Sequence, residues 1–334
     1  MKAIVLISGG LDSTVAAKLT KDLGVELIAV NTVSPFCLCN HRSSSGCFHG
    51  ASLVAKDLGL KLISINVAEE FLEIVKSPKH GYGSNMNPCI DCRILLFRKA
   101  KEIMQKEAAS FVITGEVLGQ RPMSQRKETM RLIEKESGLV GLVVRPLSAK
   151  VLEPTIPEAQ GWIAREKLFA INGRGRREQM DLAKEFGIND YPCPSGGCLL
   201  TDPEFSKRLK DLMKFQQFNL HEIQLLKIGR HFRLNGTAKL IVGRNESENA
   251  QLLNLAREND YIIEPTETLA GPTALCRGVF DKDLLKLCCS ITCDYCDLNG
   301  QDSADMVYKK LPDTENIIIN VSPVQKDKLL SLRV

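Results

Sequence analysis

The chain has 334 residues, enough for two or three domains, and its 44% hydrophobic and 25% charged residues are those of a globular protein. The formal net charge of +4 is too small to predict nucleic-acid binding, so such a function would have to depend on local basic clusters. Since no apolar run is long enough to cross a bilayer and the first residues lead into a strand instead of a signal peptide, the sequence predicts a cytoplasmic protein with no membrane partner. Twelve cysteines in that compartment are expected to be ligands, nucleophiles or buried small side chains, not a disulfide framework.

Strand-like and helix-like segments alternate over the first third of the chain. Strands are expected at 3–7, 26–31, 61–67 and 111–114, and helices near 13–23, 50–58 and 92–108. Such alternation is typical of βαβ units, which build a parallel sheet with helices on both faces and ligands at the carboxyl ends of the strands. The sequence therefore predicts a Rossmann-like α/β domain.

The most informative segment joins the first strand to the first helix and reads Ser8-Gly9-Gly10-Leu11-Asp12-Ser13. The adjacent glycines let the backbone approach a ligand closely, and the freed N–H groups face an anion together with the positive end of the helix. Ser8 and Ser13 add hydroxyl donors, and Asp12 is a candidate ligand of Mg²⁺. The segment predicts a site for the phosphates of a nucleotide.

Two further polar segments are expected at the same edge of the sheet. Asn31 ends the second strand, where an adenine or ribose could be contacted, and Gly115 and Gln120 follow the fourth strand. Ordinary connections are the alternative, but a place opposite the glycine loop favours contacts with the same nucleotide.

Three cysteines are candidates for sulfur or metal chemistry. Cys89 and Cys92 form a C-x-x-C pair at a helix start, where metal ligation, a redox pair and a persulfide carrier are all open. Cys198 follows a loop rich in Pro and Gly far along the chain. Three cysteines without a nearby histidine pattern leave one coordination position open, as expected of a 4Fe-4S cluster with one iron free for a substrate sulfur, whereas structural zinc needs four protein ligands.

Two groups of arginines are candidates for RNA contacts. Guanidinium groups at a glycine-flanked helix start can bind phosphate oxygens, although a solvated charged face is the alternative. This first group consists of Arg174, Arg176 and Arg177. The second group lies beyond an expected domain boundary near residue 216 and consists of Arg230, Arg233 and Arg244.

The remaining cysteines form two further groups. Cys37, Cys39, Cys47 and His49 could bind zinc by residue type, but their spacing matches no common zinc finger. The second group falls on an expected helix, where buried small side chains explain the cysteine stripe without a metal. It consists of Cys288, Cys289, Cys293 and Cys296.

The motifs together resemble a known enzyme family. The segment at 8–13 resembles the pyrophosphate loop (PP-loop) of ATP pyrophosphatases. With the segments at 87–93 and 115–120 and the Arg145-Pro146-Leu147 turn, it is similar to the tRNA thiouridine synthases of the MnmA and ThiI type. In that family ATP adenylates a uridine carbonyl oxygen in tRNA, and sulfur then displaces AMP.

The resemblance implies roles for the candidate residues. Asp12, Cys89 and Cys198 would be catalytic, and Cys92 would join the two cysteines in holding the cluster. ATP and Mg²⁺ would be cofactors, and the partners would be tRNA and a sulfur donor, either sulfide or a separate carrier. The ATP contacts would come from Ser8, Gly9, Gly10, Asp12, Ser13, Asn31, Gly115 and Gln120.

The C-terminal part resembles a second family, the RNA-binding domain of NFACT proteins, through its Val242-Gly243-Arg244-Asn245 turn. The expected organisation is a PP-loop domain at 1–150, a helical extension with the basic helix and the Gly-Gly-Cys loop at 151–215, and a smaller α+β RNA-binding domain at 216–334. That last domain would supply the tRNA contacts, because the THUMP module of ThiI is not found.

Three alternatives remain open. In a cluster-free route Cys198 would carry a persulfide and Cys89 would release its sulfur. A PP-loop synthetase acting on a small molecule is disfavoured by the three cysteines, and an RNA-binding protein with a vestigial ATP site is disfavoured by the intact Asp12 and loop serines. The sequence does not determine the uridine position, C2 or C4 as the thiolated carbon, or the oligomeric state.

Overall fold

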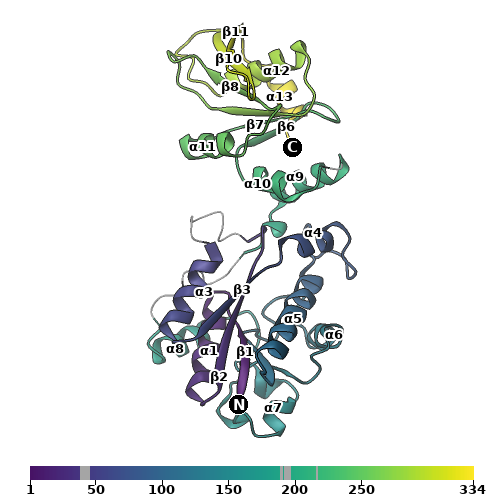
Figure 1. Ribbon diagram of the computed structural model, residues 1–334, viewed down its shortest axis with the longest axis vertical. Helices are drawn as coiled ribbons and strands as arrows, with labels where there is room; N and C mark the ends of the chain where they lie inside the picture. The colour runs from purple at the N-terminus through teal and green to yellow at the C-terminus, as the bar shows by residue number, and fades with distance from the viewer. Residues whose placement is uncertain (38–45, 189–190, 192–196, 216) are drawn as a thin grey trace. The chain divides into compact units, whose positions relative to one another are not determined.

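The computed structural model describes residues 1–37, 46–188, 191, 197–215 and 217–334 (Figure 1). Its contacts divide the chain into two compact units, Met1–Asp202 and Pro203–Val334. The division precedes the expected boundary near residue 216 because helix α9 (Pro203–Lys214) packs with the second unit, where Arg208 Nη1 donates to the carbonyl of Leu226 at 2.8 Å. No helix within the described ranges is long and apolar enough to cross a membrane.

The first unit contains a five-stranded parallel sheet in the order β3-β2-β1-β4-β5. Its strands are β1 (Lys2–Leu6), β2 (Glu26–Val33), β3 (Lys61–Asn66), β4 (Phe111–Thr114) and β5 (Val143–Val144). The four expected strands are confirmed, and β5 is additional. Because β2 and β3 lie on one side of β1 and β4 and β5 on the other, strand order reverses at β1, and ligands bind at the carboxyl ends of the strands beside such a switch point.

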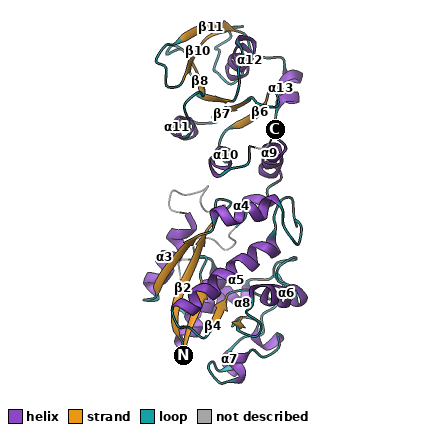
Figure 2. Ribbon diagram, turned by 45° about the vertical axis from the view of Figure 1, so that its right-hand side comes forward, coloured by secondary structure: helices purple, strands orange, loops and turns teal. Residues whose placement is uncertain are grey.

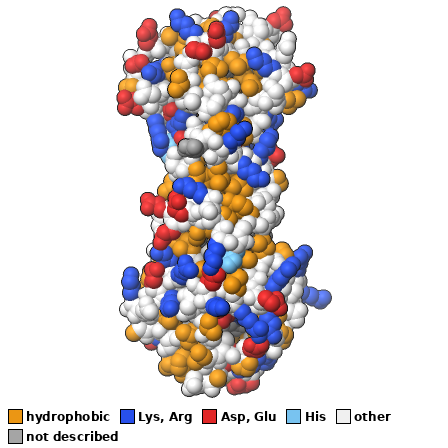
Figure 3. Space-filling view, turned by 90° about the vertical axis from the view of Figure 1, so that its right-hand side faces the viewer, with side chains coloured by type: hydrophobic (Ala, Val, Ile, Leu, Met, Phe, Trp, Pro, Cys, Tyr) orange, Lys and Arg blue, Asp and Glu red, His pale blue; other side chains and the backbone are white. Residues whose placement is uncertain are grey.

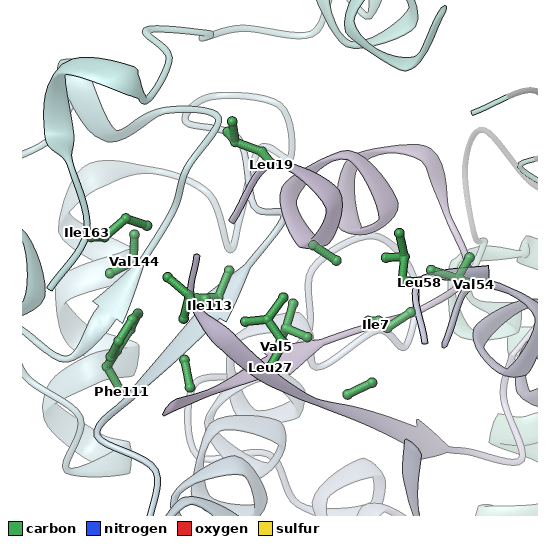
Figure 4. Packing of buried hydrophobic residues seen from close by; sticks show 14 of the residues in the cluster. Val5, Ile7, Leu19, Leu27, Val54, Leu58, Phe111, Ile113, Val144 and Ile163 are labelled. Carbon is green, nitrogen blue, oxygen red and sulfur yellow. The ribbon is translucent and has the colours of Figure 1, made fainter. Parts of the chain in front are cut away.

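Helices cover both faces of this sheet (Figures 1 and 2). The helices described in this unit are α1 (Leu11–Asp22), α3 (Gly46–Asp57), α4 (Ala68–Lys76), α5 (Cys89–Lys106), α6 (Lys127–Ser137), α7 (Ile156–Ala159) and α8 (Arg177–Glu185). Adjacent residues of one strand serve opposite faces, as the strand period of two requires. Val5 and Ile113 pack with the side chains of α1 and α3 (Figure 4), whereas Ile4 and Val112 pack against Phe97 of α5. The predicted α/β class is confirmed.

The second unit contains a six-stranded antiparallel sheet in the order β11-β10-β8-β9-β7-β6. Its strands are β6 (Arg230–Arg233), β7 (Lys239–Val242), β8 (Tyr261–Pro265), β9 (Ala274–Arg277), β10 (Ala304–Lys310) and β11 (Ile317–Val321). The helices that follow α9 are α10 (Leu220–Leu225), α11 (Glu246–Asn254), α12 (Lys282–Cys293) and α13 (Lys326–Leu332). The predicted smaller α+β domain is thereby confirmed.

The cysteine stripe of α12 lies in the core of the second unit. Cys288, Cys289 and Cys293 are fully buried and pack with Cys276 of β9, while Cys296 is partly buried just beyond the helix. The prediction that these cysteines act as small core side chains is confirmed for the three on the helix.

Candidate functional site

A cavity of about 290 Å³ opens in the first unit at the carboxyl ends of β1, β2 and β4. It brings the predicted nucleotide contacts and the predicted sulfur-chemistry cysteines onto one surface, although they come from segments almost 200 residues apart. The predicted residues in its lining are Ser8, Gly10, Asp12, Ser13, Asn31, Cys89, Cys92, Gly115, Gln120, Arg176 and Cys198. Gly9 is the predicted nucleotide contact that is not part of the lining.

The loop from Ser8 to Ser13 is shaped by close backbone contacts. Gly9 has φ +75°, and a Cβ there would lie 2.8 Å from the carbonyl carbon of Gly50, so only glycine fits. The side chains of Ser8 and Ser13 bond to each other at 3.2 Å, and the Ser13 hydroxyl donates to the carbonyl of Gly10 at 2.9 Å. Gly9 therefore sets the shape of the loop.

Gly115 brings the end of β4 against the same loop. A Cβ on Gly115 would lie 2.5 Å from the carbonyl carbon and oxygen of Asp12 and 2.6 Å from the amide of Ser13. These are backbone atoms that cannot swing aside. The structural role of Gly115 is therefore to let β4 and the loop approach each other closely.

Asp12 has one paired and one unpaired carboxylate oxygen. Its Oδ2 accepts a hydrogen bond from Gln120 Nε2 at 3.0 Å, whereas Oδ1 is buried with no hydrogen-bond partner among the described residues. Burial raises the pKa of Asp12, and the Gln120 hydrogen bond, Arg176 and Arg121 oppose that shift. A buried carboxylate oxygen without a partner fits Mg²⁺, which binds through one or two carboxylates and the phosphates of a substrate. Asn31 Nδ2 is likewise buried without a partner in the described part of the chain.

Three arginines of the described residues line the cavity: Arg93, Arg121 and Arg176. Burial lowers the pKa of Arg121, and the neighbouring positive charges of Arg93 and Arg176 lower it further. An anion bound between guanidinium groups reduces the repulsion among their positive charges, and the forked geometry of these groups matches phosphate oxygens. Arg93 and Arg121 were not among the predicted site residues, although Arg93 directly follows the C-x-x-C pair and Arg121 directly follows Gln120.

A buried ionic network positions a residue of the cavity lining, Arg93. Arg145, 4% exposed, donates from Nε to Glu116 Oε2 at 3.1 Å and from Nη1 to Glu134 Oε1 at 2.5 Å. Glu116 in turn lies 3.4 Å from Arg93 Nε. The Arg145 turn that contributes to the family resemblance therefore positions Glu116, and through it Arg93, instead of entering the cavity.

The three predicted thiols share the cavity wall with a fourth, Cys37. Cys89 Sγ donates to the buried hydroxyl of Ser124 at 3.2 Å. Burial raises the pKa of Cys92 to about 12 and that of Cys198 to about 11. These two thiols are therefore protonated and weakly nucleophilic at neutral pH, and a metal ion would have to displace their protons.

Cluster ligation and binding of a single ion make different demands on these thiols. No three His, Cys, Asp or Glu side chains converge on one point in the parts of the chain that the structure describes. In an iron–sulfur cluster each thiolate binds its own iron, so thiols spaced around one cavity fit the group. Of the alternative zinc ligands, Cys39 lies outside the described residues and the side chain of Cys47 is not described, so that interpretation stays a prediction.

The predicted RNA-contact arginines lie in different surroundings. Arg174 and Arg177 are exposed at the start of α8. In the second unit Arg230 stacks on Tyr295, 4.4 Å from the ring centroid, and Arg233 pairs with Asp211 and stacks on Phe215.

Arg244 is the most open of the three C-terminal arginines. Its side chain is 41% exposed and pairs with Glu248, while Asn245 of the same turn caps α11. Figure 3 shows lysine and arginine side chains interspersed with acidic ones on the surface of both units. Arg230 and Arg233 thus have internal contacts, and Arg244 is the most accessible to a phosphate.

Two family models match the chain. Residues 1–156 match the family described as "Thiamine biosynthesis protein (ThiI)", and residues 229–332 match the "NFACT protein RNA binding domain". The first part of the chain is thus similar to the ThiI family and the C-terminal part to the NFACT RNA-binding domain, which confirms both predicted resemblances.

Individual proteins are similar over parts of their length. A "Probable tRNA sulfurtransferase" of Methanosarcina mazei is 31% identical over 209 residues, which cover 61% of this chain and 43% of that protein. The protein in the crystal structure of a 4-thiouridine synthetase–RNA complex with bound ATP is 24% identical in sequence. The match covers 68% of this chain and 52% of that protein chain, with a TM-score of 0.38. The U34-tRNA thiolase NcsA of Methanococcus maripaludis with its [4Fe-4S] cluster is 18% identical, with coverages of 68% and 73% and a TM-score of 0.35. The chain thus spans less than half of the Methanosarcina relative.

Proposed function

We propose that this chain, a ThiI-type domain followed by an NFACT-type RNA-binding domain, is an ATP-dependent tRNA sulfurtransferase. The observation that carries the proposal is the shared cavity, in which the PP-loop-like segment and Cys89, Cys92 and Cys198 face one space. Activation of the carbonyl oxygen and attack of sulfur on the carbonyl carbon occur at the same carbonyl group, so both sets of groups have to reach one point. The sulfurtransferase name of the Methanosarcina relative supports the same substrate class.

In the first step ATP would adenylate a uridine carbonyl oxygen of tRNA. The amides of the loop and the guanidinium groups of Arg121 and Arg176 would bind the phosphates, and Asp12 Oδ1 would hold Mg²⁺ against them. Charge accumulates on the leaving pyrophosphate, so these cationic groups stabilise the transition state most where the charge develops. Gln120 keeps Asp12 oriented through its hydrogen bond to Oδ2.

In the second step sulfur would displace AMP from the activated carbon. Cys89, Cys92 and Cys198 are the residues that would hold a 4Fe-4S cluster, because they are the predicted thiols of the cavity. When bound, such a cluster supplies an open iron position that can hold sulfide from solution or from a separate donor. Ser124 orients Cys89 by accepting its S–H, and it would donate its own O–H to the thiolate after ligation.

The second unit would bind the tRNA. Its NFACT-type domain supports RNA as the ligand, with Arg244 and, in the first unit, Arg174 and Arg177 as phosphate contacts. These contacts orient the nucleic acid without reading its sequence, so they do not specify the uridine that is thiolated.

Pyrophosphate release by the full chain, with and without tRNA, tests the proposal. Release that requires tRNA supports a sulfurtransferase, whereas release with a small carboxylate and without tRNA would support the synthetase alternative. Anaerobic purification then separates the two sulfur routes: about four irons per chain, lost in Cys89→Ser, Cys92→Ser and Cys198→Ser, are expected for a cluster. Full thiolation from sulfide by an iron-free preparation would contradict the cluster route, whereas iron-free thiolation that requires a persulfide donor would favour the persulfide route.

A further inference from the structure

Two cysteines from distant segments lie opposite each other in the wall of the cavity. Cys37 follows β2 and Cys198 precedes the short turn at Leu199–Thr201, and the two form an isolated antiparallel bridge. Beside the bridge the amide of Leu199 donates to the carbonyl of Phe36 at 2.8 Å. In an antiparallel ladder, a hydrogen bond between the residues that flank a pair in this way means that the pair itself is of the non-hydrogen-bonded type. Cys37 and Cys198 are therefore a non-hydrogen-bonded pair.

That pairing sets the distance between the two thiols. In a non-hydrogen-bonded antiparallel pair the Cα atoms lie about 4.5 Å apart and the side chains leave the same face of the ladder. A disulfide requires Cα atoms about 4.4–6.8 Å apart. A bridge of this type therefore places the Cα atoms of Cys37 and Cys198 at a separation that a disulfide can span.

Two further observations agree with this proximity. Both residues contribute to the lining of the same cavity and are partly exposed. Besides burial, charges on the Cys89 and Cys37 sulfurs both contribute to the raised pKa of Cys198, so both thiols are near it. Cys89, in contrast, extends from helix α5, and its thiol is directed to the Ser124 hydroxyl by a hydrogen bond.

We propose that Cys37 and Cys198 form a disulfide when the chain meets a small disulfide oxidant such as oxidised glutathione. The Cys37 thiolate attacks one sulfur of the oxidant and releases the first glutathione as a thiolate. The Cys198 thiol then gives up its proton to solvent, and its sulfur attacks the Cys37 sulfur of the mixed disulfide and releases the second glutathione as a thiolate. The protein loses two protons and two electrons, and the oxidant is reduced to two thiols, so atoms and electrons balance.

The disulfide would switch the site off reversibly. A sulfur held in a disulfide cannot bind iron as a thiolate, so oxidation would remove Cys198 from the three ligands assigned above, and reduction would return it. This consequence rests on the proposed function, whereas formation of the disulfide does not. Cys37, which the sequence analysis placed in a possible zinc site, would be the sensing partner.

Peptide mapping of the full chain tests the inference directly. The chain is freed of iron with a chelator, reduced, exposed anaerobically to oxidised glutathione, alkylated and digested with trypsin. We expect a cross-linked pair of the peptides ending at Arg42 and Lys207, lighter than the two reduced peptides by two hydrogens and absent after reduction. If the other accessible thiols are fully oxidised and this cross-linked pair is still not found, the proposal is overturned.

Matched variants identify the cysteines, because each peptide carries a second one. Cys37→Ser and Cys198→Ser should lose the cross-link, whereas Cys39→Ser, Cys193→Ser and Cys89→Ser should keep it. A cross-link that survives Cys37→Ser, or that Cys89→Ser abolishes, would contradict the proposed pair.

Iron uptake then tests the consequence separately. The oxidised chain should take up iron and sulfide at least about tenfold less than the reduced chain, and a dithiol should restore uptake. If the disulfide forms and iron uptake is unchanged, the disulfide stands and the assignment of Cys198 as a cluster ligand fails.

Discussion

Replacing Gly115 with alanine should separate β4 from the PP-loop-like segment. The new Cβ would lie 2.5 Å from backbone atoms of Asp12, about 0.9 Å inside the 3.4 Å at which ordinary contacts begin. Because neither backbone can yield without moving its neighbours, overpacking should lower the free energy of unfolding of the first unit by about 1–3 kcal/mol. A displaced Ser13 amide would lose a charge-assisted hydrogen bond to a phosphate, about 1.5–3 kcal/mol, so ATP affinity should fall roughly 10- to 100-fold.

Urea unfolding and calorimetric titration with ATP measure these two effects. Gly175→Ala is the matched control, because a Cβ at Gly175 would meet no atom within 4 Å. It should leave stability within about 1 kcal/mol of the wild type, since alanine also restricts the unfolded chain. Wild-type stability and ATP affinity in Gly115→Ala would refute the close packing of β4 against the loop.

Three further perturbations test other parts of the molecule. Asp12→Asn keeps the size of the side chain but removes its charge, so tRNA-dependent pyrophosphate release should fall at least about 100-fold, and wild-type release would contradict a Mg²⁺ role for Asp12. Deleting residues 203–334 should weaken tRNA binding and flatten its salt dependence in filter-binding assays while ATP binding persists; an unchanged salt slope would assign the phosphate contacts to the first unit. Burial, together with the charges of Arg208 and Lys239, holds the pKa of His231 well below 6.5. As the pH falls below 6.5, the unfolded chain therefore binds a proton at His231 that the folded unit does not bind. The contribution of His231 to the free energy of unfolding should therefore be constant above about pH 6.5 and fall below it by up to about 1.4 kcal/mol per pH unit. His231→Gln should reduce that slope in urea titrations at pH 7.5 and 5.5, leaving the part due to His221, whose pKa burial and Arg277 also lower.

The elements that the sequence predicted are those with strong local signals. The strand at 111–114 agrees residue for residue with β4, because a short apolar run ends at a glycine. The nucleotide loop was predictable for the same reason, since its glycines, serines and aspartate are adjacent in the chain. β5 has two residues, too few for a periodic pattern, and it forms only by pairing with β4.

Contacts between residues far apart in the sequence were not predictable. Cys37 was grouped with its sequence neighbours, yet its bridge partner Cys198 is 161 residues away, and nothing near Cys37 in the sequence encodes that pairing. Arg176 was expected on an RNA-binding face with Arg174 and Arg177, but Arg176, the N-cap of α8, lines the cavity, whereas Arg174 and Arg177 are exposed. The internal contacts of Arg233 depend on Asp211 of α9, a helix that the sequence analysis placed in another domain.

The hydroxyl contacts within the Ser8–Ser13 loop bear on how quickly a nucleotide can bind. The amides of Ser8 and Gly10 are occupied only by long bonds to serine hydroxyls, at 3.3 and 3.4 Å. Phosphate oxygens can replace such weak acceptors one at a time, and the backbone need not refold before a ligand arrives. Association should therefore proceed in a single kinetic phase proportional to ATP concentration, without a slow ordering step of the loop.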